Sequence, residues 1–415
     1  MTNLKVIRAG RLIDGTGAAM QRDRAVYVEN GRIIGLEPAG DPPADAEVIN
    51  LPDSSVLPGL IDGHVHLVFS AGTYPLGDLE VENDQRLLLR GVAAARQALG
   101  AGITTVRDLG GRGGVTFRLR DGITAGLIAG PRILAAGSPI TITGGHCHFL
   151  GLEADDETGV RAAARSQLKS GATCLKIMAT GGRMTPGTNV GMAQFGVAEI
   201  QGAVDEARRA NVPIAAHAIG TAGIKNATQA GVNTIEHCSW LGRTPSVEFD
   251  EQTAARMAAQ RTAAVPTMVT IKGAMAAASG NLSAGLKEHI ALRPEIVNCL
   301  QRMLSLGVPF VAGTDAGVAW TPFDSLVSEL EMYVTEVGMT PLQAINSATG
   351  AAARTLGLDA SVGILAVGRE ADLIAVDGDP SVRIGDLGAV QLVMKSGAVV
   401  ARNGQVLDRP SAPNR

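Results

Sequence analysis

The stretch that decides the fold is Pro58-Gly59-Leu60-Ile61-Asp62-Gly63-His64-Val65-His66. It has the character of a short apolar strand whose polar end carries two imidazoles with one residue between them. Side chains alternate between the two faces of a strand, so His64 and His66 project to the same side and can bind one ion. A lone histidine in an apolar run is more often a packed core residue, so a metal site needs further ligands from elsewhere in the chain.

The length and composition of the chain limit its class. Its 415 residues fit two or three domains, unless one of them is a large α/β barrel. Hydrophobic residues make up 46% and charged residues 18%, which is typical of a globular protein with a buried core. With 36 basic against 40 acidic residues, and without a basic cluster interleaved with aromatics, nucleic acid is not an expected partner.

The lack of a recognisable targeting signal and the spacing of the cysteines favour a cytoplasmic protein. The start of the chain lacks a basic segment followed by an apolar one, so we expect no secretory signal. No apolar run approaches the roughly 20 residues that span a bilayer, so a membrane protein is not expected. The four cysteines lack a CxxC spacing, which fits reduced thiols in a cytosol: Cys147, Cys174, Cys238 and Cys299.

Both ends of the chain predict β-structure. Strand patterns occupy residues 5–7, 25–28 and 32–36 near the start and residues 371–376 and 392–400 near the end. Neither end has enough strands to cover a face, so we expect both to form one small β-sandwich. The predicted domains are therefore residues 1–57 plus 364–415, a composite β-sandwich, and residues 58–363.

Between the two ends, short β-rich runs alternate with helical stretches. Seven strands are expected after the HxH strand, at residues 103–107, 132–136, 173–178, 212–217, 233–237, 263–267 and 309–315. Helices fit between them, for example at residues 87–99, 160–170, 197–210, 221–230 and 250–260. Eight such units predict an α/β fold, a (β/α)8 TIM barrel. A doubly wound sheet would need a GxGxxG turn after its first strand, and the chain has none there.

The ends of the expected barrel strands, where barrel active sites are built, carry metal-ligand types. Four of the seven histidines lie there, with one lysine and one aspartate: His64, His66, His217, His237, Lys176 and Asp315. Lys176 stands out, because an ammonium buried in an apolar strand costs several kcal/mol unless it is paired. Either it pairs with a carboxylate at the barrel mouth, or burial lowers its pKa and the free amine takes up CO2. The resulting carbamate can bridge two metal ions.

In these residues the chain resembles the binuclear amidohydrolase superfamily, which has HxH on the first strand, Lys on the fourth, His on the fifth and sixth and Asp on the eighth. The flanking residues 57–64 and 368–373 are similar to its boundary signatures. The chain most resembles the branch that cleaves Xaa-Pro dipeptides, N-acyl amino acids and ochratoxin-like amides. Two stretches carry that narrower resemblance: Thr143-Gly144-Gly145-His146 and Ala179-Thr180-Gly181-Gly182.

The resemblance implies two divalent ions, zinc by ligand type, and a homo-oligomer. A hydroxide bridging the ions would attack the scissile carbonyl, because two Lewis acids lower the pKa of bound water. Asp315 would accept its proton and pass it to the leaving nitrogen. The implied ligands are His64, His66 and Asp315 for one ion, His217 and His237 for the other, and carboxylated Lys176 between them.

Three loop residues are candidates for contact with substrate. His146, in a Gly-rich loop after the third strand, either joins the catalytic site or is a solvated loop histidine. Arg183 and Thr188, in the loop of residues 181–191, could reach a substrate carboxylate, since loops after strands set specificity in barrels.

Other polar residues are expected to have structural roles. We expect Arg107 and Asp108, at the end of the second strand, to form an ion pair, the alternative being contact with substrate. His148 is expected in a solvated loop, and His289, beside Lys287 and Glu288, on the surface.

These residues support one main functional hypothesis and two alternatives. The first is a metal-dependent amidohydrolase that cleaves the C–N bond of a dipeptide, an N-acyl amino acid or an ochratoxin-like aryl amide. The second keeps the binuclear site and changes the substrate to a cyclic amide, lactone, carbamate or amidine, because the fold alone does not fix the bond. A mononuclear deaminase would not need Lys176. The third is a non-catalytic barrel, which the six filled ligand positions argue against.

Overall fold

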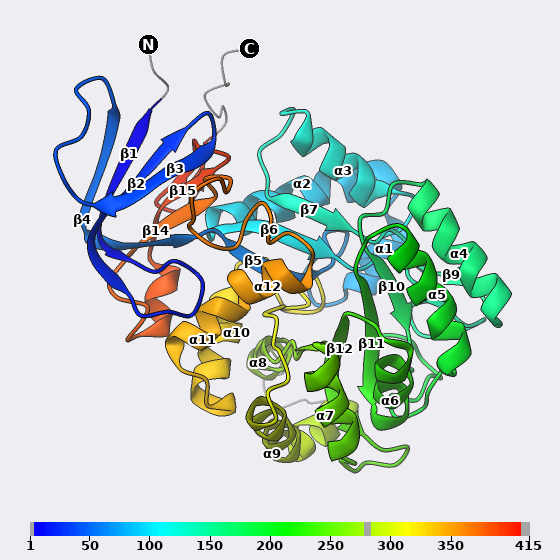
Figure 1. Ribbon diagram of the computed structural model, residues 1–415. Coiled ribbons are helices and arrows are strands. Elements are labelled where there is room, and N and C mark those ends of the chain that lie inside the picture. The colour runs from blue at the N-terminus through cyan, green and yellow to red at the C-terminus, as the bar shows by residue number, and fades with distance from the viewer. Residues whose placement is uncertain (1–3, 278–283, 408–415) are drawn as a thin grey trace.

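The computed structural model describes residues 4–277 and 284–407. Strands from the two ends of the chain lie side by side in one sheet, and the residues between them form a barrel surrounded by helices (Figure 1). The predicted fold class, a TIM barrel with a small β-structure formed from both termini, is confirmed. Residues 1–3 and 408–415, at the outer ends of the expected composite domain, lie outside the described residues.

The terminal sheet has eight strands in the order β17-β16-β15-β14-β4-β1-β2-β3. The two halves join where β4 pairs antiparallel with β14, and the sheet curls so that Ile33 N donates to Arg369 O at 2.9 Å. Both halves share one apolar cluster, which includes Ile7, Val26 and Leu373. The strands are β1 (Lys5–Leu12), β2 (Gln21–Glu29), β3 (Arg32–Pro38), β4 (Glu47–Pro58), β14 (Leu373–Asp377), β15 (Val390–Lys395), β16 (Ala398–Arg402) and β17 (Gln405–Val406).

Seven regular strands of the barrel lie within or close to the predicted ranges, and their pairings are parallel. Their buried, nearly continuous apolar sequences suit strands covered on both faces. They are β5 (Leu60–Val65), β6 (Ile103–Asp108), β7 (Arg132–Ala135), β10 (Leu175–Met178), β11 (Ile214–Gly220), β12 (Thr234–Leu241) and β13 (Ala263–Val265). Two short strands, β8 (Ile140–Thr141) and β9 (Leu152–Glu153), extend the sheet beside β10.

The predicted eighth strand, residues 309–315, is an extended segment rather than a regular strand. It closes the barrel through backbone hydrogen bonds on both sides: Ala264 N donates to Pro309 O at 2.9 Å, and Gly63 N donates to Ala312 O at 2.8 Å. The segment approaches β5 so closely that a Cβ on Gly63 would lie 2.7 Å from a Val311 methyl group. Glycine at position 63 is therefore required by the closure of the barrel.

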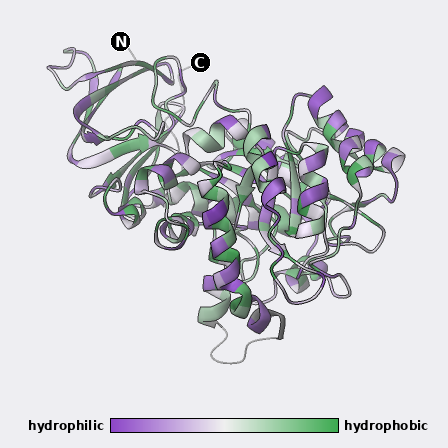
Figure 2. Cartoon of the chain, turned by 60° about the horizontal axis from the view of Figure 1, so that its bottom comes forward, coloured by the Kyte–Doolittle hydropathy of each residue, from purple (hydrophilic) through white to green (hydrophobic). Residues whose placement is uncertain are grey.

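The helices of the barrel lie outside its strands, and most connect one strand to the next (Figure 1). Figure 2 shows green and purple bands alternating along them, as expected for helices with one face on a core. The helices are α1 (Pro75–Val81), α2 (Asp84–Gly100), α3 (Val115–Thr124), α4 (Glu157–Lys169), α5 (Val197–Arg209), α6 (Thr221–Ala230), α7 (Glu251–Gln260), α8 (Val269–Ala277), α9 (Ala284–Ser305), α10 (Leu326–Met332), the π-helix η1 (Tyr333–Val337), α11 (Pro341–Ser347), α12 (Gly350–Thr355) and the 3-10 helix η2 (Ile384–Gly388).

Side-chain caps fix where several of these helices begin. Asn83, Asp156 and Asp250 each accept a hydrogen bond from a backbone N–H in the first turn, at the starts of α2, α4 and α7. Thr340 and Gln343 form a capping box at the start of α11.

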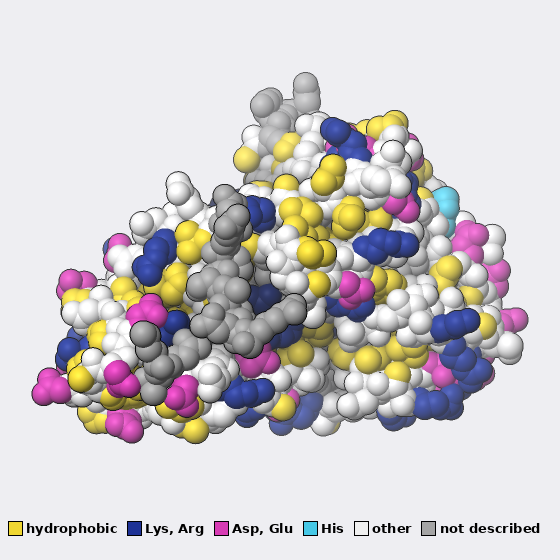
Figure 3. All heavy atoms as spheres, turned by 90° about the horizontal axis from the view of Figure 1, so that it is seen from above, with side chains coloured by type: hydrophobic (Ala, Val, Ile, Leu, Met, Phe, Trp, Pro, Cys, Tyr) yellow, Lys and Arg dark blue, Asp and Glu magenta, His cyan; other side chains and the backbone are white. Residues whose placement is uncertain are grey.

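The face of the molecule seen in Figure 3 carries side chains of both charges interspersed with hydrophobic ones. Among the described residues, no helix has the length and apolar character needed to cross a membrane.

Candidate metal centre

The polar side chains predicted from the strand ends come together in the structure. Buried or nearly buried positions at one end of the barrel hold His64 and His66 from β5 and the residue after it, Lys176 from β10, His217 from β11, His237 from β12, and Asp315 from the closing segment. The charges of Lys176 and Asp315 affect each other and the pKa values of several of the imidazoles. All six side chains therefore lie close together.

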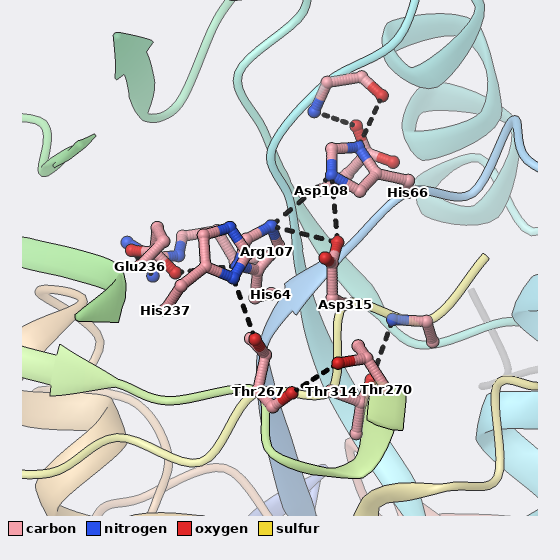
Figure 4. A network of polar contacts seen from close by, with 12 residues as sticks. His64, His66, Arg107, Asp108, Glu236, His237, Thr267, Thr270, Thr314 and Asp315 are labelled. Carbon is pink, nitrogen blue, oxygen red and sulfur yellow. Dashed lines mark hydrogen bonds and ion pairs between the residues drawn. The ribbon is translucent and has the colours of Figure 1, made fainter. Parts of the chain in front are cut away.

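Three of these side chains form a compact set of donors (Figure 4). His64 Nε2 lies 3.4 Å from His66 Nε2, and both nitrogens lie 3.3 Å from Asp315 Oδ1. The Asp315 oxygen is buried and, within the described parts of the chain, accepts no well-formed hydrogen bond. An unsatisfied carboxylate oxygen facing two imidazole nitrogens is the donor set that a divalent ion satisfies.

The imidazoles of His217 and His237 form a second pair of donors, with ring centroids 4.7 Å apart. His217 Nε2 lies 3.1 Å from Gly181 O, and His237 Nδ1 lies 2.8 Å from Thr267 Oγ1. Each ring therefore has one nitrogen held by the protein and the other left as a ligand: Nδ1 of His217 and Nε2 of His237. Metal-binding histidines are commonly oriented in this way.

Left-handed backbone conformations concentrate around these donors. The φ angles are 67° at His237, 59° at Asp315 and 53° at Thr267, whose branched side chain makes that conformation especially unfavourable. Each costs on the order of 1–3 kcal/mol and persists only where the surrounding structure enforces it. The surrounding structure therefore holds these three residues in unfavourable backbone conformations that fix the directions of their side chains.

Burial keeps most of the imidazoles neutral. It lowers the pKa of His64 and His217 well below the usual value and that of His237 to about 4. For His66, burial is outweighed by the Asp315 carboxylate, so its pKa is raised. Neutral imidazoles have the free lone pair that a metal ion needs.

Lys176 is only 2% exposed. Burial lowers the pKa of its amine, and the negative charges of Glu236 and Asp315 only partly offset that effect. No carboxylate of the described residues forms an ion pair with its amine, and Glu236 and Asp315 act on it only through their charge. A buried amine with a lowered pKa is the form that reacts with CO2.

Carboxylates behind the donors fix their positions. Asp62 accepts hydrogen bonds from His64 N at 3.1 Å and from Thr314 Oγ1 at 2.6 Å, and so ties β5 to the closing segment. Asp108 accepts from Leu67 N at 2.7 Å, next to His66. Burial raises the pKa of Asp62 to about 7 and that of Asp108 to about 6.

The expected ion pair between Arg107 and Asp108 is wrong. Successive residues of a strand point to opposite faces, and Arg107 points into the barrel, where its Nη2 lies 3.0 Å from Glu236 Oε1. Neither Arg107 nor Glu236 is exposed, so Arg107 cannot contact substrate either.

A cavity of about 940 Å³ opens above the donors. His146, His217, His237 and Asp315 line it, so the site is accessible to a small molecule. Apolar side chains form much of the wall: Ile219, Leu241, Met268, Ile271, Leu292 and Ile296. The rim carries three arginines, Arg183, Arg243 and Arg293, of which Arg293 forms an ion pair with Glu336.

The loop residues predicted to contact substrate occupy different positions in this cavity. His146 is buried against His217, with ring centroids 4.4 Å apart, and faces the cavity; His148 is exposed, as expected. Arg183 lies at the rim. Thr188 also lines the cavity, but its hydroxyl donates to the Gly182 and Thr185 carbonyls and so holds its own loop.

The expectation of a surface position for His289 is wrong. It is half-buried, lines the cavity, and accepts a hydrogen bond from Arg183 Nη2 at 3.0 Å through Nδ1. Leu292 and Ile296 follow on the same helical face, at spacings that place all three on the cavity side of α9. The apolar spacing of these residues is the sequence pattern that could have indicated the position of His289.

Glu236, Thr267 and Arg243 are further residues of the site that sequence reasoning did not identify. Glu236 carried a signal, since it is a charge inside an apolar strand, as Lys176 is. Thr267 and Arg243 lie in loops after strands, where no local pattern indicates which residue faces the cavity.

The comparisons with known proteins agree with this geometry. A family model described as the amidohydrolase family matches residues 55–404. This chain belongs to the amidohydrolase family. Membership makes the protein a hydrolase, and it accounts for the barrel joined to a terminal β-structure.

Relatives of this amidohydrolase cover nearly its whole length. Ochratoxinase of Aspergillus niger is 30% identical over 416 residues, which span 90% of this chain and 81% of that protein. The crystal structure of a Xaa-Pro dipeptidase with bound methionine matches with a TM-score of 0.85 and 31% identity, over 96% of this chain and 99% of the other. The crystal structure of A. niger ochratoxinase matches with a TM-score of 0.83 and 28% identity, over 96% and 95%.

Proposed function

We propose that this amidohydrolase is a binuclear metal-dependent enzyme that cleaves the C–N bond of small peptide-like amides: dipeptides, N-acyl amino acids or aryl amides of amino acids. The observation that carries the proposal is the set of three donor atoms 3.3–3.4 Å apart, one of them an unsatisfied carboxylate oxygen, next to an open cavity. The names of the relatives, ochratoxinase and Xaa-Pro dipeptidase, support the substrate class.

The residues present fit two divalent ions, for which zinc suits the ligand types. His64, His66 and Asp315 would hold one, His217 Nδ1 and His237 Nε2 the other, and carboxylated Lys176 would lie between them. When bound, the two ions would supply Lewis acidity for the carbonyl and for water.

Asp315 would hold and move the proton in this reaction. Burial opposes the charge of its carboxylate, but His64 and His66 outweigh burial and lower the pKa, so the side chain is ionised and can accept a hydrogen bond from water. It lines the cavity with 14% of its side chain exposed, within reach of a leaving nitrogen. His146, whose ring packs against that of His217 and lines the cavity, would contact the substrate near the scissile bond.

The cavity supports a substrate with one apolar part and one anionic part. The apolar wall suits an aliphatic or aromatic group, and burying such a group stabilises a complex by roughly 1.5–3 kcal/mol. Arg183 and Arg243 at the rim would bind a carboxylate, for which the guanidinium is well matched. This arrangement favours amides of amino acids over uncharged amides.

A hydrolysis screen tests the proposal. Protein reconstituted with zinc in the presence of bicarbonate is assayed on dipeptides, N-acyl amino acids and aryl amides of amino acids, and in parallel on cyclic amides, lactones and carbamates. Turnover of the linear amides that chelators abolish supports the proposal. Turnover confined to the cyclic amides, lactones or carbamates would contradict the proposed substrate class and assign a different one. No turnover by metal-loaded protein would contradict the proposed function.

A further inference from the structure

A buried pair of charged side chains, Arg107 and Glu236, lies beside His64 (Figure 4). Arg107, on β6, and Glu236, on β12, are both fully buried. Their strands are not neighbours in the barrel, so the pair spans its interior. Glu236 Oε1 lies 3.0 Å from Arg107 Nη2, and Glu236 Oε2 lies 2.9 Å from His64 Nδ1.

Arg107 is held by contacts with two other strands, β5 and β12. Besides Glu236, its Nη1 donates to Thr234 Oγ1 at 2.9 Å, and its Nε donates to Gly63 O at 2.6 Å. Gly63 directly precedes His64, so the guanidinium fixes both the backbone next to His64 and the carboxylate that faces its ring.

A packing role alone does not account for this pair. Two charges buried in a barrel interior lose solvation, and apolar side chains of similar volume usually fill such a space at no cost in stability. In the part of the chain that the structure describes, Glu236 Oε2 and His64 Nδ1 are both buried and neither makes a hydrogen bond of regular geometry. The 2.9 Å contact between them is therefore the one polar contact available to either atom among these residues.

We infer that Glu236 and Arg107 are positioning residues for His64. Glu236 accepts a hydrogen bond from the Nδ1–H of His64, which leaves the lone pair on Nε2, the atom that faces His66 and Asp315. Arg107 acts through Glu236 by fixing the direction of its carboxylate. A histidine ligand whose second nitrogen is held by a carboxylate is a better oriented and more basic donor. This inference rests on the proposed role of His64 as a metal ligand.

Metal affinity, measured without reference to activity, tests the inference. Metal-free wild-type protein, Glu236→Gln, Arg107→Met and the double variant are titrated with Zn2+ in competition with a chelating dye. Glu236→Gln preserves shape and removes the charge. We expect it to weaken one of two binding events by about 10- to 100-fold and to leave the other unchanged. Arg107→Met should weaken the same event, and the double variant should bind no more weakly than Glu236→Gln, because Arg107 acts through Glu236.

Arg132→Met is the matched control, because it breaks an arginine–carboxylate contact with Glu370 and Asp372 that is far from the donors in the sequence and joins β7 to the terminal sheet. It should lower stability and leave both binding events unchanged. If Arg107→Met does not fold, Glu236→Gln still decides the matter. Wild-type affinity in Glu236→Gln, or additive losses in the double variant, would overturn the inference alone. Absence of zinc binding by the wild-type protein would overturn both it and the proposed function.

Discussion

Arg132 joins the barrel to the terminal sheet, and its replacement gives a prediction with a defined size. Its Nη2 lies 2.6 Å from Glu370 Oε2 and its Nη1 lies 3.1 Å from Asp372 Oδ2. The Asp372 side chain is 1% exposed, whereas those of Arg132 and Glu370 are 24% and 25% exposed. Removing one partner of a buried pair costs about 3–5 kcal/mol, and we expect roughly 2–3 kcal/mol for Arg132→Met because water reaches part of this network.

The loss of stability in Arg132→Met should depend on pH. Burial already raises the pKa of Asp372, against the opposing effect of Arg132. Without the arginine, the folded-state pKa rises further above the unfolded value, so the folded variant binds the additional proton. Its stability relative to wild type therefore falls as pH rises from the unfolded pKa through the folded one. The deficit should be small near pH 5 and largest near pH 8.

Calorimetric unfolding of wild type, Arg132→Met and Arg132→Met/Asp372→Asn at both pH values provides the assay. The double variant lacks the buried charge and should recover most of the stability lost at pH 8. An equal deficit at pH 5 and pH 8, or a double variant less stable than Arg132→Met, would refute the reasoning.

Three further predictions concern the site. Thr267→Val keeps the branched shape and removes the oxygen 2.8 Å from His237 Nδ1, so the binding of one zinc ion should weaken about 10- to 100-fold in a competition titration; unchanged affinity would contradict the assigned contact. Arg243→Ala should raise KM for N-acyl amino acids about 5- to 30-fold, because it removes a charge-assisted contact that solvent exposure weakens, and should leave KM for the corresponding amino acid amides unchanged. Equal effects on both substrates would argue against carboxylate binding. Removal of metal by chelation and dialysis should abolish hydrolysis, and zinc with bicarbonate should restore it; activity that survives complete metal removal would contradict metal dependence.

The barrel and its donors could be predicted from the sequence because both depend on local patterns. Each strand is a short apolar run, and each donor interrupts or follows one, as His217 follows Ile214-Ala215-Ala216. Parallel strands place their carboxyl ends at one edge, so residues far apart in the chain were expected to meet. The eighth strand was only partly right, because residues 309–315 lie between two isolated bridges and end at the left-handed Asp315, which apolar character does not reveal.

Contacts across the barrel interior could not be predicted in the same way. The partner of Arg107 depends on which of several buried acids lies opposite, and that follows from barrel geometry rather than from neighbours in the chain. His289 was misassigned because two adjacent charged residues outweighed the apolar spacing of Leu292 and Ile296. The rim position of Arg243 depends on a loop conformation, which involves close contact between Gly191 and Gly242.

The central claim is that Lys176 carries a captured CO2 that joins two metal ions. The most direct test is to reconstitute wild type and Lys176→Ala with zinc and 13C-bicarbonate, and to measure metal content and the 13C NMR spectrum of each. Wild type should bind two zinc ions per chain and show a carbamate resonance, whereas Lys176→Ala should lack the resonance, lose an ion and be nearly inactive. A Lys176→Ala protein with two ions and wild-type turnover, or a wild type without a carbamate, would contradict the account.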